Sequence, residues 1–119
     1  MRQYEDIHSE EINGFHVTTS INYEDIHPRD MFDYSEDEMR DLCEKIDNGY
    51  YSWFCVRVEV RKRGVILGSD YLGGCLYENP RDFINDAYYE DMVNNALTDA
   101  KETLKALNSE YLIEQPLIV

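Results

Sequence analysis

The stretch that most restricts the fold lies near the middle of the chain, where two alternating segments flank a short turn. In the first segment every second residue is apolar, and the set comprises Phe54, Val56, Val58 and Val60. A period of two is typical of a β-strand with one buried face. The two-residue loop is either Lys62-Arg63 or Arg63-Gly64, and both place Val65, Leu67 and Tyr71 on the face of the valines. We therefore predict an antiparallel hairpin over residues 53–71.

A second hairpin is predicted near the start of the chain. Asn13-Gly14 is a pair that tolerates the positive φ angles of a type I′ turn. Apolar and polar residues alternate over residues 15–21, which predicts a half-buried strand. Residues 4–12 alternate poorly, and we expect an edge strand or simply an extended segment there.

A short helix is predicted after an acidic loop. Ser35 and Glu38 form a capping box, and Gly49 supplies a stop signal. Between them one face is apolar, with Met39, Leu42, Cys43 and Ile46 at helical spacing. The helix is therefore amphipathic and bounded at both ends.

The last third of the chain predicts a bulge or bend followed by a long helix. Gly73-Gly74 interrupts the strand pattern, and Asn79-Pro80 marks a helical start. Residues 88–107 then carry an apolar stripe at helical spacing. We expect the helix to be broken near Asp86, just before this stripe begins. The stripe predicts burial of Met92, Val93, Leu97 and Leu104. Residues 111–119 are apolar for a chain end, and we expect them to pack as an extended segment or to contact a partner.

Together these elements predict an α+β fold in a single domain over residues 1–119. Its antiparallel sheet has about three to five strands and is covered on one face by two helices. The length of 119 residues is near the commonest domain size, so one hydrophobic core is expected.

The net charge of −14 restricts the partners of the chain. Nucleic acids and anionic membranes are bound through Lys and Arg, so direct binding to either is disfavoured. No apolar run approaches the roughly 18 residues that a membrane span needs. The three cysteines are an odd number without Cys-x-x-Cys spacing, which argues against a disulfide framework and favours a reducing cytoplasm.

The negative charge is concentrated in residues 1–49, which hold 14 acidic and 4 basic side chains. This local net charge of −10 matches that of about 17 Å of duplex DNA, at one charge per roughly 1.7 Å. We predict a continuous partner-binding acidic surface, whose members are Glu24, Asp25, Asp30, Asp33, Glu36, Asp37, Asp41 and Glu44. The alternative is an ordinary solvated helix face.

We weighed two kinds of chemical site and predict neither. The pentapeptide Tyr-Glu-Asp-Ile-His occurs at residues 4–8 and 23–27, but its spacing matches no known metal-ligand pattern. Nucleophilic catalysis requires a cysteine beside His8, His16 or His27. Apolar positions explain Cys43 and Cys55 better, which leaves only Cys75, after Gly73-Gly74, as a candidate. We expect no catalytic residue, no metal and no cofactor.

In size, acidity and tyrosine content the chain resembles the anti-restriction and anti-CRISPR inhibitors of bacteriophages and mobile elements, several of which imitate DNA. The resemblance is one of class and transfers no site residue. It implies a non-enzymatic inhibitor, in a bacterial cytoplasm, that occupies a basic nucleic-acid-binding surface of a host defence protein. The alternative is a phage accessory or structural interaction module whose charge serves only solubility. A homodimer stays open.

Overall fold

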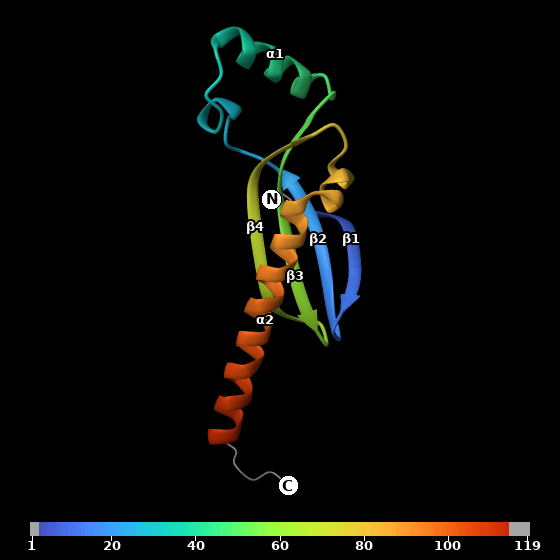
Figure 1. Cartoon of the computed structure of the whole chain (residues 1–119), viewed down its shortest axis with the longest axis vertical. Helices are drawn as coiled ribbons and strands as arrows, with labels where there is room; N and C mark the ends of the chain where they lie inside the picture. Colours follow the sequence, from blue (N-terminus) through green and yellow to red (C-terminus); the bar gives the residue numbers. More distant parts are fainter. Residues whose placement is uncertain (1–2, 115–119) are drawn as a thin grey trace.

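The computed structural model describes residues 3–114, which form one antiparallel sheet and two α-helices (Figure 1). The elements are β1 (Glu5–Ile12), β2 (Phe15–Tyr23), η1 (Pro28–Asp30), α1 (Glu36–Asp47), β3 (Ser52–Lys62), β4 (Val65–Tyr77), η2 (Pro80–Asn85) and α2 (Ala87–Glu114). The strand order is β1-β2-β3-β4. The predicted α+β class with an antiparallel sheet is therefore confirmed.

Both predicted hairpin turns are present, and each has two residues with positive φ. The first turn has φ 53° at Asn13 and 83° at Gly14, and the second has 53° at Arg63 and 78° at Gly64. Positive φ at both central residues defines the type I′ turn, whose twist matches that of the flanking strands. The second hairpin thus uses Arg63-Gly64 as its loop, and β1 is the predicted edge strand.

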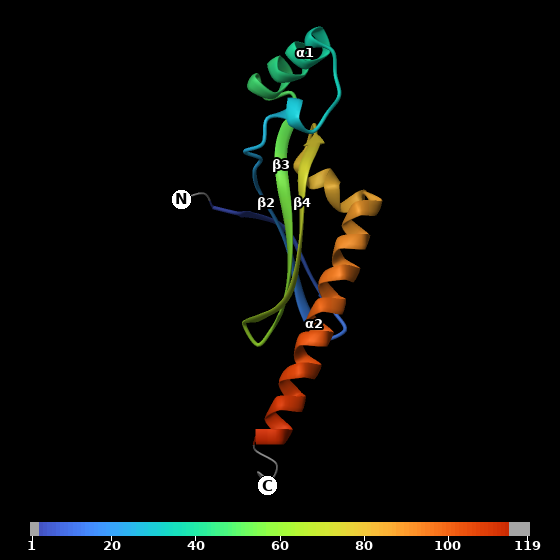
Figure 2. The ribbon, with the colours of Figure 1, turned by 90° about the vertical axis from the view of Figure 1, so that its left-hand side faces the viewer.

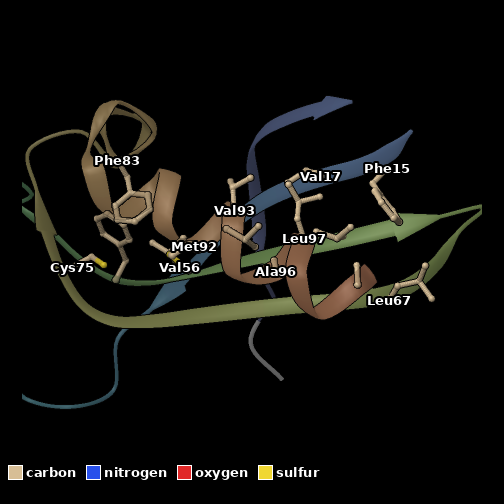
Figure 3. Packing of buried hydrophobic residues seen from close by; sticks show 14 residues of the cluster. Phe15, Val17, Val56, Leu67, Cys75, Phe83, Met92, Val93, Ala96 and Leu97 are labelled. Atoms are coloured by element: carbon tan, nitrogen blue, oxygen red, sulfur yellow. The ribbon is translucent and has the colours of Figure 1, made fainter. Parts of the chain in front are cut away.

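The core lies between α2 and one face of the sheet. Val17 pairs with Val60 and Thr19 with Val58, so these residues of β2 and β3 share that face. Met92, Val93 and Leu97 of α2 are buried against it, as predicted (Figure 3). Leu104, which was also predicted to be buried, is only half-buried at the margin of the core.

The helix backbone lies very close to the sheet at Gly68 of β4. A Cβ atom built on Gly68 would lie 2.6 Å from the backbone nitrogen of Ala100 and would clash with the carbonyl oxygen of Ala96. Both alanines are fully buried. Small residues on both elements therefore allow the helix backbone to rest directly on the strand.

The helix α1 does not cover the sheet, contrary to the prediction that both helices share one face. It lies beyond the end of the sheet, where it packs against η1 (Figures 1 and 2). Four residues separate α1 from β3, and the amide of the last of them, Tyr51, donates back to the Lys45 carbonyl in the last turn of α1 at 3.0 Å. The tight connection keeps the helix at the strand's start, and only α2 covers the predicted face.

The predicted orientation of Tyr71 is also wrong. Gly68 lies opposite Val60 and Ile66 lies opposite Arg61, so Leu67 is an extra residue in β4. This bulge reverses the orientation of the side chains that follow it, up to the second register shift of β4. Tyr71 consequently lies opposite Arg57 on the other face and is 61 % exposed. A second register shift, where β4 contains Gly73 and Gly74, confirms the predicted irregularity there.

The long helix continues beyond its predicted end. α2 begins at Ala87, directly after the predicted interruption at Asp86, and its backbone is helical through Glu114. Residues 111–114 are therefore helical and not extended, and residues 115–119 of the predicted tail lie outside the described residues. Among the residues described, no helix is both long and apolar enough to cross a membrane.

The face of the sheet opposite α2 is polar and carries a charged row along β3. Arg57 and Arg61 both contact Glu59, with N···O distances of 3.3 and 3.0 Å, and Glu59 is only 6 % exposed. The ring of Tyr4 lies over Arg57, with 3.8 Å from its centroid to the guanidinium carbon. Ion pairs and a cation–π contact thus compensate the buried charge.

Carboxylates occupy the free edge of β4 at two places. The Ser69 amide donates to Asp99 of α2 at 3.2 Å, and the Gly74 amide donates to Glu24 at 2.7 Å. These amides are therefore bonded although β4 has no neighbouring strand on that side.

The close approach at Gly68 predicts that Gly68→Ala destabilises the protein. An alanine in a strand normally stabilises by reducing the entropy of the unfolded chain, but here its Cβ forces α2 away from the sheet. We expect a loss of about 1–3 kcal/mol in the free energy of unfolding, typical of overpacking. Urea denaturation measures it, with the exposed substitution Thr98→Ala as control. A Gly68→Ala protein as stable as the control would show that the helix does not rest on Gly68.

Candidate functional site

The predicted acidic loop and helix form one body at the end of the sheet. We call residues 24–51 the acidic lobe; it includes η1 and α1 (Figures 1 and 2). These 28 residues contain ten acidic and three basic side chains. The lobe therefore carries a net charge of −7, half of that of the whole chain.

Local signals at both ends define the helix of the lobe. The Glu38 amide donates to the Ser35 side chain at 3.2 Å, and the Ser35 amide donates to the Glu38 carboxylate at 3.1 Å. The hydrogen bond from the Ser35 backbone holds the pKa of Glu38 below its usual value. At the other end Gly49 has φ 84°, which ends the helix. The predicted capping box and stop are confirmed.

Trp53, at the start of β3, attaches the lobe to the sheet. Its indole nitrogen donates to the Ile26 carbonyl at 2.8 Å, and its ring lies 5.6 Å from that of Phe32. The side chain is only 8 % exposed although it lies near the end of the sheet. The loop before α1 thus wraps around one aromatic residue that satisfies both its packing and its hydrogen bonding.

Glu24 is a second attachment point. Its carboxylate accepts the Gly74 amide at 2.7 Å, and its backbone amide donates to the Trp53 carbonyl at 3.3 Å. Met31 also lies against Gly74, whose φ of 69° and lack of a side chain admit the thioether. Glu24 is half-buried, and its two hydrogen bonds hold this predicted residue in place against the sheet.

The other seven predicted carboxylates are exposed. Asp37 pairs with Arg40 and Asp41 with Lys45, each at 3.1 Å, and such exposed pairs contribute little. Asp25 also has an interaction partner. Among the described residues no ion pair engages the remaining four, which are Asp30, Asp33, Glu36 and Glu44. These four are the side chains best placed to pair with a cationic partner.

A hollow of about 430 Å³ lies where the acidic lobe meets the sheet. Ile21, Phe54 and Tyr51 contribute apolar and aromatic surface to it, and Glu5 contributes a carboxylate. A site with apolar walls and a carboxylate suits a long cationic side chain such as arginine, whose stem is apolar and whose head is charged.

Apolar side chains of the lobe were not part of the predicted site. The exposed large ones are Ile26, Met31, Tyr34 and Tyr50, with 40–53 % of each accessible. The chain's ten tyrosines were the one available signal in the sequence, but composition does not say which of them are exposed.

The two Tyr-Glu-Asp-Ile-His segments do not converge on one site. In the first, His8 contacts Glu10 at 2.6 Å, and Tyr89 of α2 donates to the same carboxylate at 3.0 Å. In the second, His27 caps η1. Within residues 3–114, no three His, Cys, Asp or Glu side chains gather in a way that could hold a metal ion.

Comparison with protein-family models, with curated proteins and with solved structures found no match to this chain. The geometry described above is therefore the basis of the functional proposal.

The contacts of Glu24 predict that Glu24→Ala loosens the acidic lobe. The substitution leaves the Gly74 amide without its acceptor, at a cost on the order of 1 kcal/mol. We expect faster hydrogen exchange at the Gly74 amide and little change at Val58 in the core. Glu44→Ala removes the same charge from an exposed position and is the matched control. Equal exchange at Gly74 in both variants would contradict an anchoring role for Glu24.

Proposed function

We propose that the chain is a non-enzymatic inhibitor that presents the acidic lobe to a basic surface of a host defence protein, in the place that nucleic acid occupies. The observation that carries the proposal is the cluster of exposed carboxylates in a firmly attached lobe. Asp30, Asp33, Glu36 and Glu44 have no ion pair among the described residues, so they are available to Arg and Lys of a partner.

The charge density of the lobe is of the order that such a partner recognises. The twelve residues of α1 extend about 18 Å at 1.5 Å per residue. The lobe's net charge of −7 equals that of about 12 Å of duplex DNA, at one charge per roughly 1.7 Å. Concentrating this charge costs stability through self-repulsion, which supports a role in binding.

The exposed apolar side chains support a protein partner. Tyrosine and methionine are enriched in the centres of protein interfaces, and isolated charges at the rim contribute mainly to the rate of association. Tyr34, Tyr50 and Met31 lie on the same lobe as the carboxylates. The partner's basic surface is therefore expected to include apolar contacts between its Arg and Lys side chains.

A second candidate function places the contact at the far end of the molecule. The C-terminal part of α2 projects past the hairpin turns (Figures 1 and 2), and Leu107 is 49 % exposed there. This observation favours an accessory interaction module that binds through an apolar helix, with the charge serving solubility.

Expression of the chain in bacteria that carry individual restriction or CRISPR systems tests the proposed function. We expect phage plating to recover in at least one such strain. Replacing Asp30, Asp33 and Glu44 by Lys turns three attractions into repulsions, and we expect it to abolish the recovery. The matched control replaces Glu90, Asp91 and Glu102 on the exposed side of α2 and makes the same change in net charge.

The purified defence protein then separates the two candidates. If the acidic lobe imitates nucleic acid, the chain competes with DNA for the protein, and its affinity falls steeply with salt because the Debye length is about 8 Å at physiological ionic strength. Contact through α2 predicts little salt dependence and loss of binding on Leu107→Glu. If the protein with Lys at positions 30, 33 and 44 folds and binds the defence protein as tightly as the control protein with the α2 replacements, the acidic lobe is not the binding site.

A further inference from the structure

The structure brings together a cysteine and a histidine that are 16 residues apart in the sequence. Cys43 lies on α1 and His27 precedes η1, with 3.8 Å between the sulfur and Nε2 of the imidazole. From the sequence Cys43 was expected to be an apolar core residue. It is only half-buried, and a titratable ring faces it.

The hydrogen bonds of His27 determine which ring nitrogen carries the proton. Nδ1 lies 3.1 Å from the backbone nitrogen of Arg29 and 3.2 Å from its side-chain Nε. A backbone amide can only donate, so Nδ1 is the acceptor and, in the neutral ring, Nε2 carries the hydrogen. Nη2 of Arg29 lies 3.4 Å from Nε2; since both groups are then donors, this longer contact is not a hydrogen bond and only places a guanidinium beside the ring. An N–H group therefore points at the sulfur of Cys43, where it stabilises negative charge.

The other two cysteines have the opposite surroundings. Cys55 donates to the Asn22 carbonyl at 3.5 Å and Cys75 to the Leu72 carbonyl at 3.8 Å, so each of these sulfurs faces an acceptor and not a donor. Cys75 is also 5 % exposed, and burial raises the pKa of its thiol to about 12. Cys43 alone among the three has a ring N–H donor at its sulfur.

Solvent has two routes to Cys43. Hollows of about 560 and 270 Å³ are each lined by both Cys43 and His27. Arg29 and Arg40 contribute positive charge to the larger hollow, and Asp33 and Glu36 contribute negative charge. The surrounding lobe is strongly acidic, so a small neutral reagent enters more readily than an anion.

We propose that Cys43 is a modification site, whose solvent-accessible sulfur small neutral hydroperoxides convert to a sulfenic acid. The thiol gives its proton to solvent as the sulfur attacks one oxygen of hydrogen peroxide, the S–O bond forms as the O–O bond breaks, and the hydroxide that leaves takes a proton from solvent to become water. The sulfur is oxidised by two electrons and the peroxide is reduced. His27 is a positioning residue, since it orients an N–H toward the sulfur without taking part in bond formation.

The modification falls at the contact that seats α1. The added oxygen places a polar atom on the helix face that packs against η1, next to Leu42, the one buried residue of that helix. Oxidation of Cys43 thus alters the attachment of the acidic lobe's helix, whatever partner the lobe binds.

Competitive thiol labelling of the native full-length chain tests the proposal. The protein is treated with limiting hydrogen peroxide, sulfenic acid is trapped with dimedone, and each cysteine is quantified by mass spectrometry. We expect Cys43 to be trapped on the order of ten-fold more than Cys55 or Cys75, because two hollows give access to its sulfur and an imidazole faces it. The neutral iodoacetamide should likewise alkylate Cys43 faster than the anionic iodoacetate. The urea-denatured chain, in which all three react alike, is the reference.

Two variants separate positioning from simple exposure. His27→Asn keeps a side-chain acceptor suited to capping η1 but removes the ring N–H, and we expect labelling of Cys43 to fall by about ten-fold. His16→Asn changes an exposed histidine on β2 and should leave labelling unchanged. Equal labelling of the three cysteines in the native chain, or unchanged labelling of Cys43 in His27→Asn, would overturn the proposal.

Discussion

The helix α2 lies on the sheet through three small residues, with Ala96 and Ala100 resting on Gly68. Because no side chain separates the two backbones there, the valines of β2 and β3 reach Met92, Val93 and Leu97 and close the core. The rest of the molecule depends on this contact. It holds β4 directly against α2, and β4 in turn supplies Gly74, to which the acidic lobe is attached.

The parts of the fold that were predictable from the sequence are those set by neighbouring residues. Asn13-Gly14, the Ser35 capping box and the alternation after Trp53 act over a few positions, and each produced the expected element. The orientation of Tyr71 and the place of α1 depended on longer-range effects. One extra residue at Leu67 reverses which of the following side chains of β4 face the core. No local pattern reveals such an insertion, because an apolar residue faces the core with or without it.

The candidate site shows the same division between composition and geometry. Charge alone indicated which segment is acidic, and seven of its eight predicted carboxylates are exposed. Charge did not distinguish Glu24, which bonds to the sheet, from Glu44, which does not, since both are the same residue type in an acidic segment. The contact of Cys43 with His27 depends on how the loop wraps around Trp53, and that path is set by packing.

The carboxylates at the edge of β4 have a consequence for how the chain behaves at high concentration. A strand of thirteen residues with one unpaired side is a template on which strands of other molecules can add and grow into fibrils. Asp99 and Glu24 already occupy two amides along that side, so an incoming strand must first displace their side chains. The acidity of this protein therefore opposes aggregation in two separate ways, by repulsion between whole molecules and by closing the edge along which sheets propagate.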